Sequence, residues 1–230
     1  MQNILITGAN GNLGTAVTDH FLGKDFQVIG TVASGAQSSF HRSLSGRPDM
    51  RTVNLADEAE AGHFVESIIT EYVRIDAAFL LVGGFSAGSV QSTGGEEIRK
   101  QISLNFETAY FVVRPLFLHM MKQNAGRIVL VGARPALNAA AGKSLLAYSL
   151  SKSLLFKLAE LLNEEAKGTN VSVSVVVPGT IDTPLNRKNM PEADPSDWVT
   201  PAQLAEVFEF MTSEKAGPLR ETVLKVYNKA

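Results

Sequence analysis

Tyr148 and Lys152 are the residues of this sequence whose types and spacing best suit acid–base chemistry. They lie four positions apart near the start of a segment with helical periodicity, so their side chains share one face of the expected helix. A phenol has an ordinary pKa of about 10, and a neighbouring ammonium group favours its ionised form. We therefore expect Lys152 to poise Tyr148 as a catalytic proton donor. The alternative is a solvent-facing pair without a chemical role.

A glycine-rich segment lies at the junction of the first expected strand and the first expected helix. Glycine permits a tight turn and close approach of a pyrophosphate, and the following helix N-terminus supplies free N–H groups. The segment predicts nucleotide binding, although a glycine turn can also simply close a strand–helix unit. The cofactor contacts expected from it are Gly8, Asn10, Gly11, Asn12, Leu13 and Gly14.

The elements that must position these residues follow an alternating order. Short β-branched runs predict strands over residues 3–7, 27–32, 51–54, 77–82, 127–131, 171–177 and 222–227. Longer periodic segments predict helices over residues 13–22, 59–72, 96–123, 145–167 and 201–211. This order is typical of an α/β, Rossmann-type doubly wound fold, with a seven-stranded parallel sheet and helices on both faces.

Two stretches, 33–49 and 180–199, lack a clear period, and we expect both to be loops beyond the carboxyl ends of strands. Ligands of open α/β sheets bind at that edge. The loop from Thr180 to Trp198 is expected to close over the substrate. No repeat or linker divides the chain, which predicts a single dinucleotide-binding domain over residues 1–230.

Composition excludes several classes of function. Lys and Arg number 21 against 23 Asp and Glu, so the chain has no basic footprint for nucleic acid. Without cysteine there is no disulfide or thiolate, and the four histidines lack metal-ligand spacing, so we expect no metal. We find no signal-like start and no run of about 18 apolar residues. We therefore expect a cytoplasmic protein without membrane partners.

Taken together, the glycine segment, the Tyr148 and Lys152 pair and the sequence Val177-Pro178-Gly179 resemble the short-chain dehydrogenase/reductase family. The resemblance covers nearly the whole chain. Within that family, residues 131–137 and 182–194 resemble the quinonoid dihydropteridine reductases. Most family members carry a serine about 13 residues before the tyrosine, whereas here the fifth strand ends Gly132-Ala133-Arg134. Dihydropteridine reductases also lack that serine.

The resemblance implies roles for further residues. Asn105 occupies the place of the family's structural asparagine, which holds a water linked to the lysine; the alternative is a polar residue that satisfies a helix distortion. Val82-Gly83-Gly84-Phe85 stands where most members have Asn-Asn-Ala-Gly. The implied cofactor contacts are Val32, Asn54, Leu55, Val82, Gly83, Gly84, Lys152, Pro178, Gly179, Thr180 and Thr183. The implied substrate contacts are Ala133, Tyr148, Asn186 and Trp198.

Cofactor preference depends on the end of the second strand, where an acidic residue would bind the ribose hydroxyls of NAD. Val32 stands there instead. The missing carboxylate removes a group that would repel a 2′-phosphate, so we expect NADP or NAD, with NADP slightly favoured. His41 and Arg42 follow downstream, and we interpret them as a solvated loop rather than as phosphate ligands.

Three functions remain open at this stage. The first is an NAD(P)H-dependent reductase that transfers hydride to a quinonoid pterin or a similar planar conjugated substrate. The second is a short-chain reductase of another ketone, imine or quinone. The third is a non-catalytic sensor of the nicotinamide cofactor, which would need neither Tyr148 nor Lys152. The family also implies a homodimer or homotetramer formed by the helices over residues 96–123 and 145–167.

Overall fold

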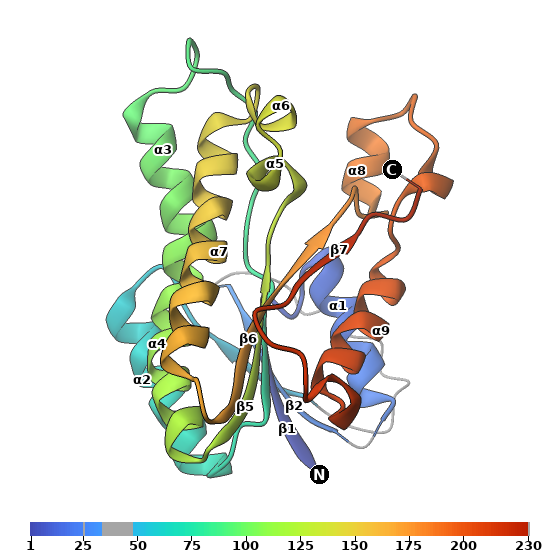
Figure 1. Ribbon diagram of the computed structural model, residues 1–230. Coiled ribbons are helices and arrows are strands. Elements are labelled where there is room, and N and C mark those ends of the chain that lie inside the picture. The colour runs from blue at the N-terminus through green and yellow to red at the C-terminus, as the bar shows by residue number, and fades with distance from the viewer. Residues whose placement is uncertain (25, 34–47, 230) are drawn as a thin grey trace.

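A computed structural model describes residues 1–24, 26–33 and 48–229 of the chain. Seven parallel strands form one sheet in the order β3-β2-β1-β4-β5-β6-β7, which confirms the predicted fold class (Figure 1). The strands are β1 (Gln2–Thr7), β2 (Phe26–Val32), β3 (Asp49–Thr52), β4 (Ala77–Leu80), β5 (Ala125–Val131), β6 (Asn170–Pro178) and β7 (Val223–Val226).

Helices cover both faces of this sheet. Figure 1 shows α2 (Glu58–Tyr72), α4 (Thr108–Lys122) and α7 (Leu146–Glu165) on one side, with α1 (Asn12–Leu22) and α9 (Pro201–Thr212) on the other. Each layer encloses its own apolar core. In the α1 and α9 layer the rings of Phe79 and Phe208 stack with centroids 5.1 Å apart. None of the described helices is both long and apolar enough to cross a membrane.

The central strands are apolar because both of their faces are covered. Every residue of β6 after Asn170 is buried, and its valines alternate with the small side chains of Ser172 and Ser174. Near-continuous apolar runs are typical of parallel strands between two helical layers. Because burial of both faces requires apolar side chains, these strands could be predicted from the sequence.

The single helix expected over residues 96–123 is three consecutive pieces. These are α3 (Gly95–Ile102), a π-helical segment η1 (Ser103–Glu107) and α4. A π-helical turn inserts extra backbone into the helix and is frequent at functional sites. Asn105 lies in this segment and is completely buried.

Several loop expectations were wrong. Residues 180–199 contain α8 (Pro184–Asn189) and a 3-10 turn η2 (Pro195–Asp197), because Thr183 caps α8 by accepting a hydrogen bond from the Asn186 N–H at 3.1 Å. Two short helices, α5 (Arg134–Leu137) and α6 (Ala139–Gly142), precede α7, and a further turn η3 (Glu214–Ala216) follows α9. β3 begins at Asp49, two positions before the expected start. His41 and Arg42 lie outside the described residues.

Candidate cofactor and catalytic site

The predicted site residues follow the carboxyl ends of the strands. Gly8 follows β1, Val82 follows β4 and Ala133 follows β5. Strands β2 and β3 extend the sheet on one side of β1, whereas β4 and the later strands extend it on the other side. The strand order therefore reverses between the neighbours β1 and β4. The Thr7 hydroxyl accepts a hydrogen bond from the Leu81 N–H at 3.0 Å and ties the two strand ends together. A reversal of this kind is where open α/β sheets bind their ligands.

The glycine segment forms a tight turn that leaves no room for a side chain at position 14. Gly8 has a φ of +65°, and a Cβ at Gly14 would lie 2.1 Å from the Gly8 carbonyl oxygen. Thr31 of β2 supports the turn, since its hydroxyl accepts from the Gly8 N–H at 3.2 Å and its carbonyl accepts from the Ala9 N–H at 2.9 Å. Thr31 gave no signal in the sequence, because only the β1–β2 pairing brings it to the turn.

The N-terminus of α1 is open toward this turn. Gly11 occupies the N-cap position and provides no side-chain hydrogen bond to the first turn of the helix. The free N–H groups and the helix dipole favour an anion at this point. The turn and the helix start therefore fit the pyrophosphate of a dinucleotide.

Lys152 is a buried cation at the centre of the site. Its side chain is 5% exposed and its Nζ donates to the Val131 carbonyl at 2.8 Å. Burial lowers the pKa of Lys152 to about 8. A Cβ at Gly83 would lie 3.0 Å from this Nζ and 2.7 Å from Asn105 Oδ1, so both side chains face the same point of the backbone. A side chain at position 83 would force the Asn105 amide to shift.

Tyr148 is half-buried at the start of α7. Burial raises the pKa of its phenol to about 12. The expectation that Lys152 favours the phenolate is therefore not met in the protein alone, because desolvation of the phenol dominates its pKa. The result leaves Tyr148 protonated near neutral pH, which is the state that a proton donor needs.

Asn105 joins the π-helical segment to the rest of the site. Its Oδ1 accepts from the Gly84 N–H at 2.9 Å, and its Nδ2 donates to the Gly84 carbonyl at 3.1 Å. Nδ2 also lies within hydrogen-bond distance of Gln101 Oε1, at 2.9 Å, and Ser151 Oγ, at 3.1 Å. Gln101 and Ser151 were missed by sequence reasoning. Their role could be recognised only in the structure, because the π-helical segment places Asn105 between Gln101 in α3 and Ser151 in α7.

The remaining predicted residues lie at the same edge of the sheet. Asn54 and Leu55 come after β3, while Gly179 and Thr180 come after β6, at whose last position Pro178 lies. Asn186, in α8, donates from Nδ2 to the Ile181 carbonyl at 2.8 Å. Trp198 is only 5% exposed, so it offers a substrate little surface.

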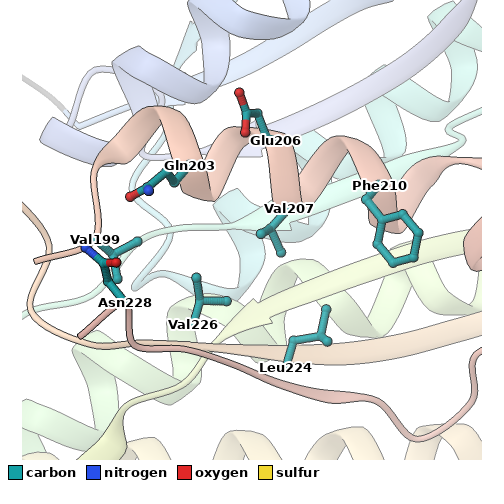
Figure 2. Close-up of a pocket in the computed structure, with 8 residues that line it drawn as sticks. All are labelled: Val199, Gln203, Glu206, Val207, Phe210, Leu224, Val226 and Asn228. Atoms are coloured by element: carbon teal, nitrogen blue, oxygen red, sulfur yellow. The ribbon is translucent and has the colours of Figure 1, made fainter. Parts of the chain in front are cut away.

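A groove of about 420 Å³ lies elsewhere, between α9 and β7 at the open edge of the sheet (Figure 2). None of the predicted site residues lines it. Its lining residues are Val199, Gln203, Glu206, Val207, Phe210, Leu224, Val226 and Asn228. Within the part of the chain that the structure describes, no three metal-binding side chains come together. The site is therefore defined by side-chain chemistry at the sheet edge, and not by this groove.

Comparison with known proteins agrees with this geometry. The family model for short chain dehydrogenases matches residues 2–194. A dihydropteridine reductase of Dictyostelium discoideum is 28% identical, over 100% of this chain and 96% of that protein. A 3-oxoacyl-acyl-carrier-protein reductase of Thermotoga maritima is 25% identical, over 96% of this chain and 94% of that protein.

Among solved structures, ElxO with NADP bound superimposes with a TM-score of 0.89 at 21% identity, covering 98% of this chain and 96% of that one. This similarity supports the fold. Because the family model covers most of the sequence, the chain belongs to the short-chain dehydrogenase family and is an NAD(P)-dependent oxidoreductase.

Proposed function

We propose that this enzyme uses NAD(P)H to reduce a quinonoid dihydropterin or a similarly flat, conjugated substrate. One observation carries the proposal. The resemblance to short-chain dehydrogenases implies a serine for a substrate carbonyl just after β5, but residues 132–134 are Gly, Ala and Arg, with Ala133 buried, while Tyr148 and Lys152 are retained. A site without that hydroxyl suits a substrate whose reduction does not depend on a hydrogen bond to a carbonyl oxygen. The similarity to a dihydropteridine reductase supports the same class.

Separate residues bind the cofactor and transfer the proton in such a reaction. When bound, the reduced nicotinamide supplies a hydride, that is, two electrons and one hydrogen nucleus. The glycine turn and the open start of α1 bind the pyrophosphate. Lys152 holds a buried positive charge, suited to cofactor ribose hydroxyls. Tyr148, protonated near neutral pH, donates the proton that completes reduction of a quinonoid dihydropterin to a tetrahydropterin, and it then regains a proton from solvent.

NADPH is the cofactor that we favour over NADH. Val32 at the end of β2 is apolar and 8% exposed, so no carboxylate at this position repels a 2′-phosphate. The similarly folded ElxO binds NADP, which supports this choice. The preference is tested by comparing KM for the two reduced cofactors with one acceptor.

A second reaction deserves the same assay, because a reductase of 3-oxoacyl thioesters is 25% identical over almost the full length. Oxidation of NADH and NADPH is followed with quinonoid dihydropterin and with a panel of ketones and quinones. We expect pterin turnover, and a loss of about 10²-fold or more for Tyr148→Phe with cofactor binding unchanged. Turnover of ketones alone would favour the second reaction. Cofactor binding without any turnover would favour a sensor.

A further inference from the structure

Phe85 is an exposed aromatic residue beside the proton donor. Its side chain is 66% exposed, and its ring lies 5.3 Å from the ring of Tyr148 with the planes at 63°. A single exposed apolar side chain needs no functional explanation on its own. The backbone on either side of Phe85, however, is held by side chains of one helix face.

The inner anchor is Asn105. Both the N–H and the carbonyl of Gly84 are hydrogen-bonded to its amide, at 2.9 and 3.1 Å. Gln101 lies one turn earlier, is 2% exposed, and accepts a hydrogen bond from Asn105 Nδ2 at 2.9 Å. A buried amide with its partners satisfied has one favoured orientation, because any rotation leaves polar atoms without partners.

The outer anchor is Glu97. Its carboxylate accepts a hydrogen bond from Gln101 Nε2 at 3.2 Å. Interaction with the Ser86 side chain is the main reason why the pKa of Glu97 is lowered. Glu97, Gln101 and Asn105 follow one another at four-residue spacing along α3 and the π-helical segment. One continuous face of this helix therefore links Glu97 through Gln101 and Asn105 to Gly84, the residue before Phe85. The effect of Ser86 on the pKa of Glu97 indicates that the same face also reaches the residue after Phe85.

We propose that Glu97 and Gln101 are positioning residues that hold the segment around Phe85, so that its ring forms a fixed wall beside Tyr148 on which a flat substrate stacks. The proposal rests on the proposed function for the substrate class. Offset or edge contacts between aromatic rings favour planar, conjugated ligands over small aliphatic ketones. A fixed wall adds affinity because the ring does not lose freedom when the substrate binds.

A double-mutant cycle tests the outer anchor at exposed or half-exposed positions, where the fold is not at risk. Ser86→Ala removes only the interaction with Glu97, whereas Glu97→Ala also removes the hydrogen bond from Gln101 Nε2. Glu96→Ala on the same helix is the control. We expect each of the first two variants to raise KM for quinonoid dihydropterin about 3- to 10-fold, with kcat and the KM for NADPH within about 2-fold of wild type. The double variant should have the same KM as Glu97→Ala, because that substitution already removes the interaction with Ser86.

The proposal would be overturned if wild type, Glu97→Ala, Ser86→Ala and the double variant had equal KM values. It would also be overturned if the effects of the two single substitutions on KM multiplied in the double variant. Glu97→Gln keeps a carbonyl oxygen that can accept from Ser86, and should restore most of the affinity. A purely structural helix role would instead change thermal stability while leaving KM unaffected.

Amide hydrogen exchange gives a readout that needs no substrate. The Gly84 N–H donates to Asn105, so Gln101→Leu should speed its exchange by about 5-fold or more, whereas Glu96→Ala should leave it unchanged. Faster exchange supports the positioning role even if dihydropterin is not turned over, in which case only the substrate class is wrong. Unchanged Gly84 exchange in Gln101→Leu contradicts the positioning role whatever the substrate.

Discussion

At the scale of single residues, the site combines a phenol and an ammonium group whose pKa values are shifted in opposite directions by burial. Desolvation disfavours the charged form of each group, so the pKa of Tyr148 rises to about 12 while that of Lys152 falls to about 8. Both groups remain protonated at pH 7. Keeping Lys152 charged inside the protein therefore lowers the free energy of unfolding, and this loss should be measurable.

Replacing Lys152 by Met should abolish turnover and stabilise the protein at pH 7 by roughly 1–3 kcal/mol. Below pH 8 the lysine is charged in both states, so the wild type bears the full cost of burial. Between about pH 8 and 10.5 the folded protein releases this proton while the unfolded chain keeps it. Wild-type stability therefore rises with pH in this window, and the difference between the two proteins shrinks.

Thermal unfolding of both proteins between pH 7 and 10.5 provides the measurement. Lys157→Met on the exposed side of α7, which loses only a surface ion pair with Glu160, serves as the control and should change stability by less than about 1 kcal/mol. A Lys152→Met protein that is less stable than wild type at pH 7 would show that the hydrogen bond to Val131 outweighs the cost of burying the charge.

At the scale of elements, the strand–turn–helix unit of β1 and α1 depends on one close approach. A Cβ at Gly14 would meet the Gly8 carbonyl oxygen at 2.1 Å and the Ala9 backbone at 2.9 Å. These neighbours are main-chain atoms that cannot move independently. The helix therefore packs against the turn only if position 14 has no side chain, which explains why a glycine stands inside a helix.

Gly14→Ala should destabilise the protein by about 2 kcal/mol or more and weaken cofactor binding at least about 10-fold, because the turn must shift away from α1. Gly62→Ala is the matched control, since Gly62 also lies within a helix, α2, but a Cβ there would meet nothing within 4 Å. That variant should gain about 0.5–1 kcal/mol. Chemical denaturation and cofactor titration measure both effects. Equal stability of the two variants would disprove the packing argument.

At the scale of the whole molecule, two helical layers enclose the sheet but leave exposed leucines on α4 and α7. Leu118 on α4 is 48% exposed, and Leu150, Leu154 and Leu161 on α7 are 46%, 36% and 62% exposed. Leu150, Leu154 and Leu161 follow one another at four- and seven-residue spacing, so they share one face of α7. Exposed apolar residues that share a face mark interaction surfaces more often than scattered ones do. We propose that this surface pairs with its copy in a homodimer, alone or within a homotetramer.

Leu161→Glu should then weaken self-association at least about 10-fold, because it would bury a charge without a partner in the interface. Sedimentation velocity at several protein concentrations measures this change. Leu219→Glu, at a 36% exposed leucine outside these helices, is the control and should associate like the wild type. A wild-type protein that remains monomeric at all concentrations would contradict the proposed dimer.

Sequence alone determined the fold class, the glycine turn and the Tyr148 and Lys152 pair. These features are local: strand and helix periodicity spans a few residues, the turn needs glycines at fixed offsets, and two residues four apart share a helix face. The seven strands were therefore predicted close to their observed bounds, and the family followed from short motifs.

Only the tertiary structure decided what depends on contacts between distant parts of the chain. The pKa of Tyr148 rose instead of falling because burial is a property of the packed molecule. Asn105 in the π-helical segment is hydrogen-bonded to Gly84 and lies within hydrogen-bond distance of Ser151, 21 and 46 positions away, and Thr31 supports the Gly8 turn from 23 positions away. Side-chain orientation in such networks depends on which hydrogen-bond partners the fold brings together, and residue spacing alone does not predict it.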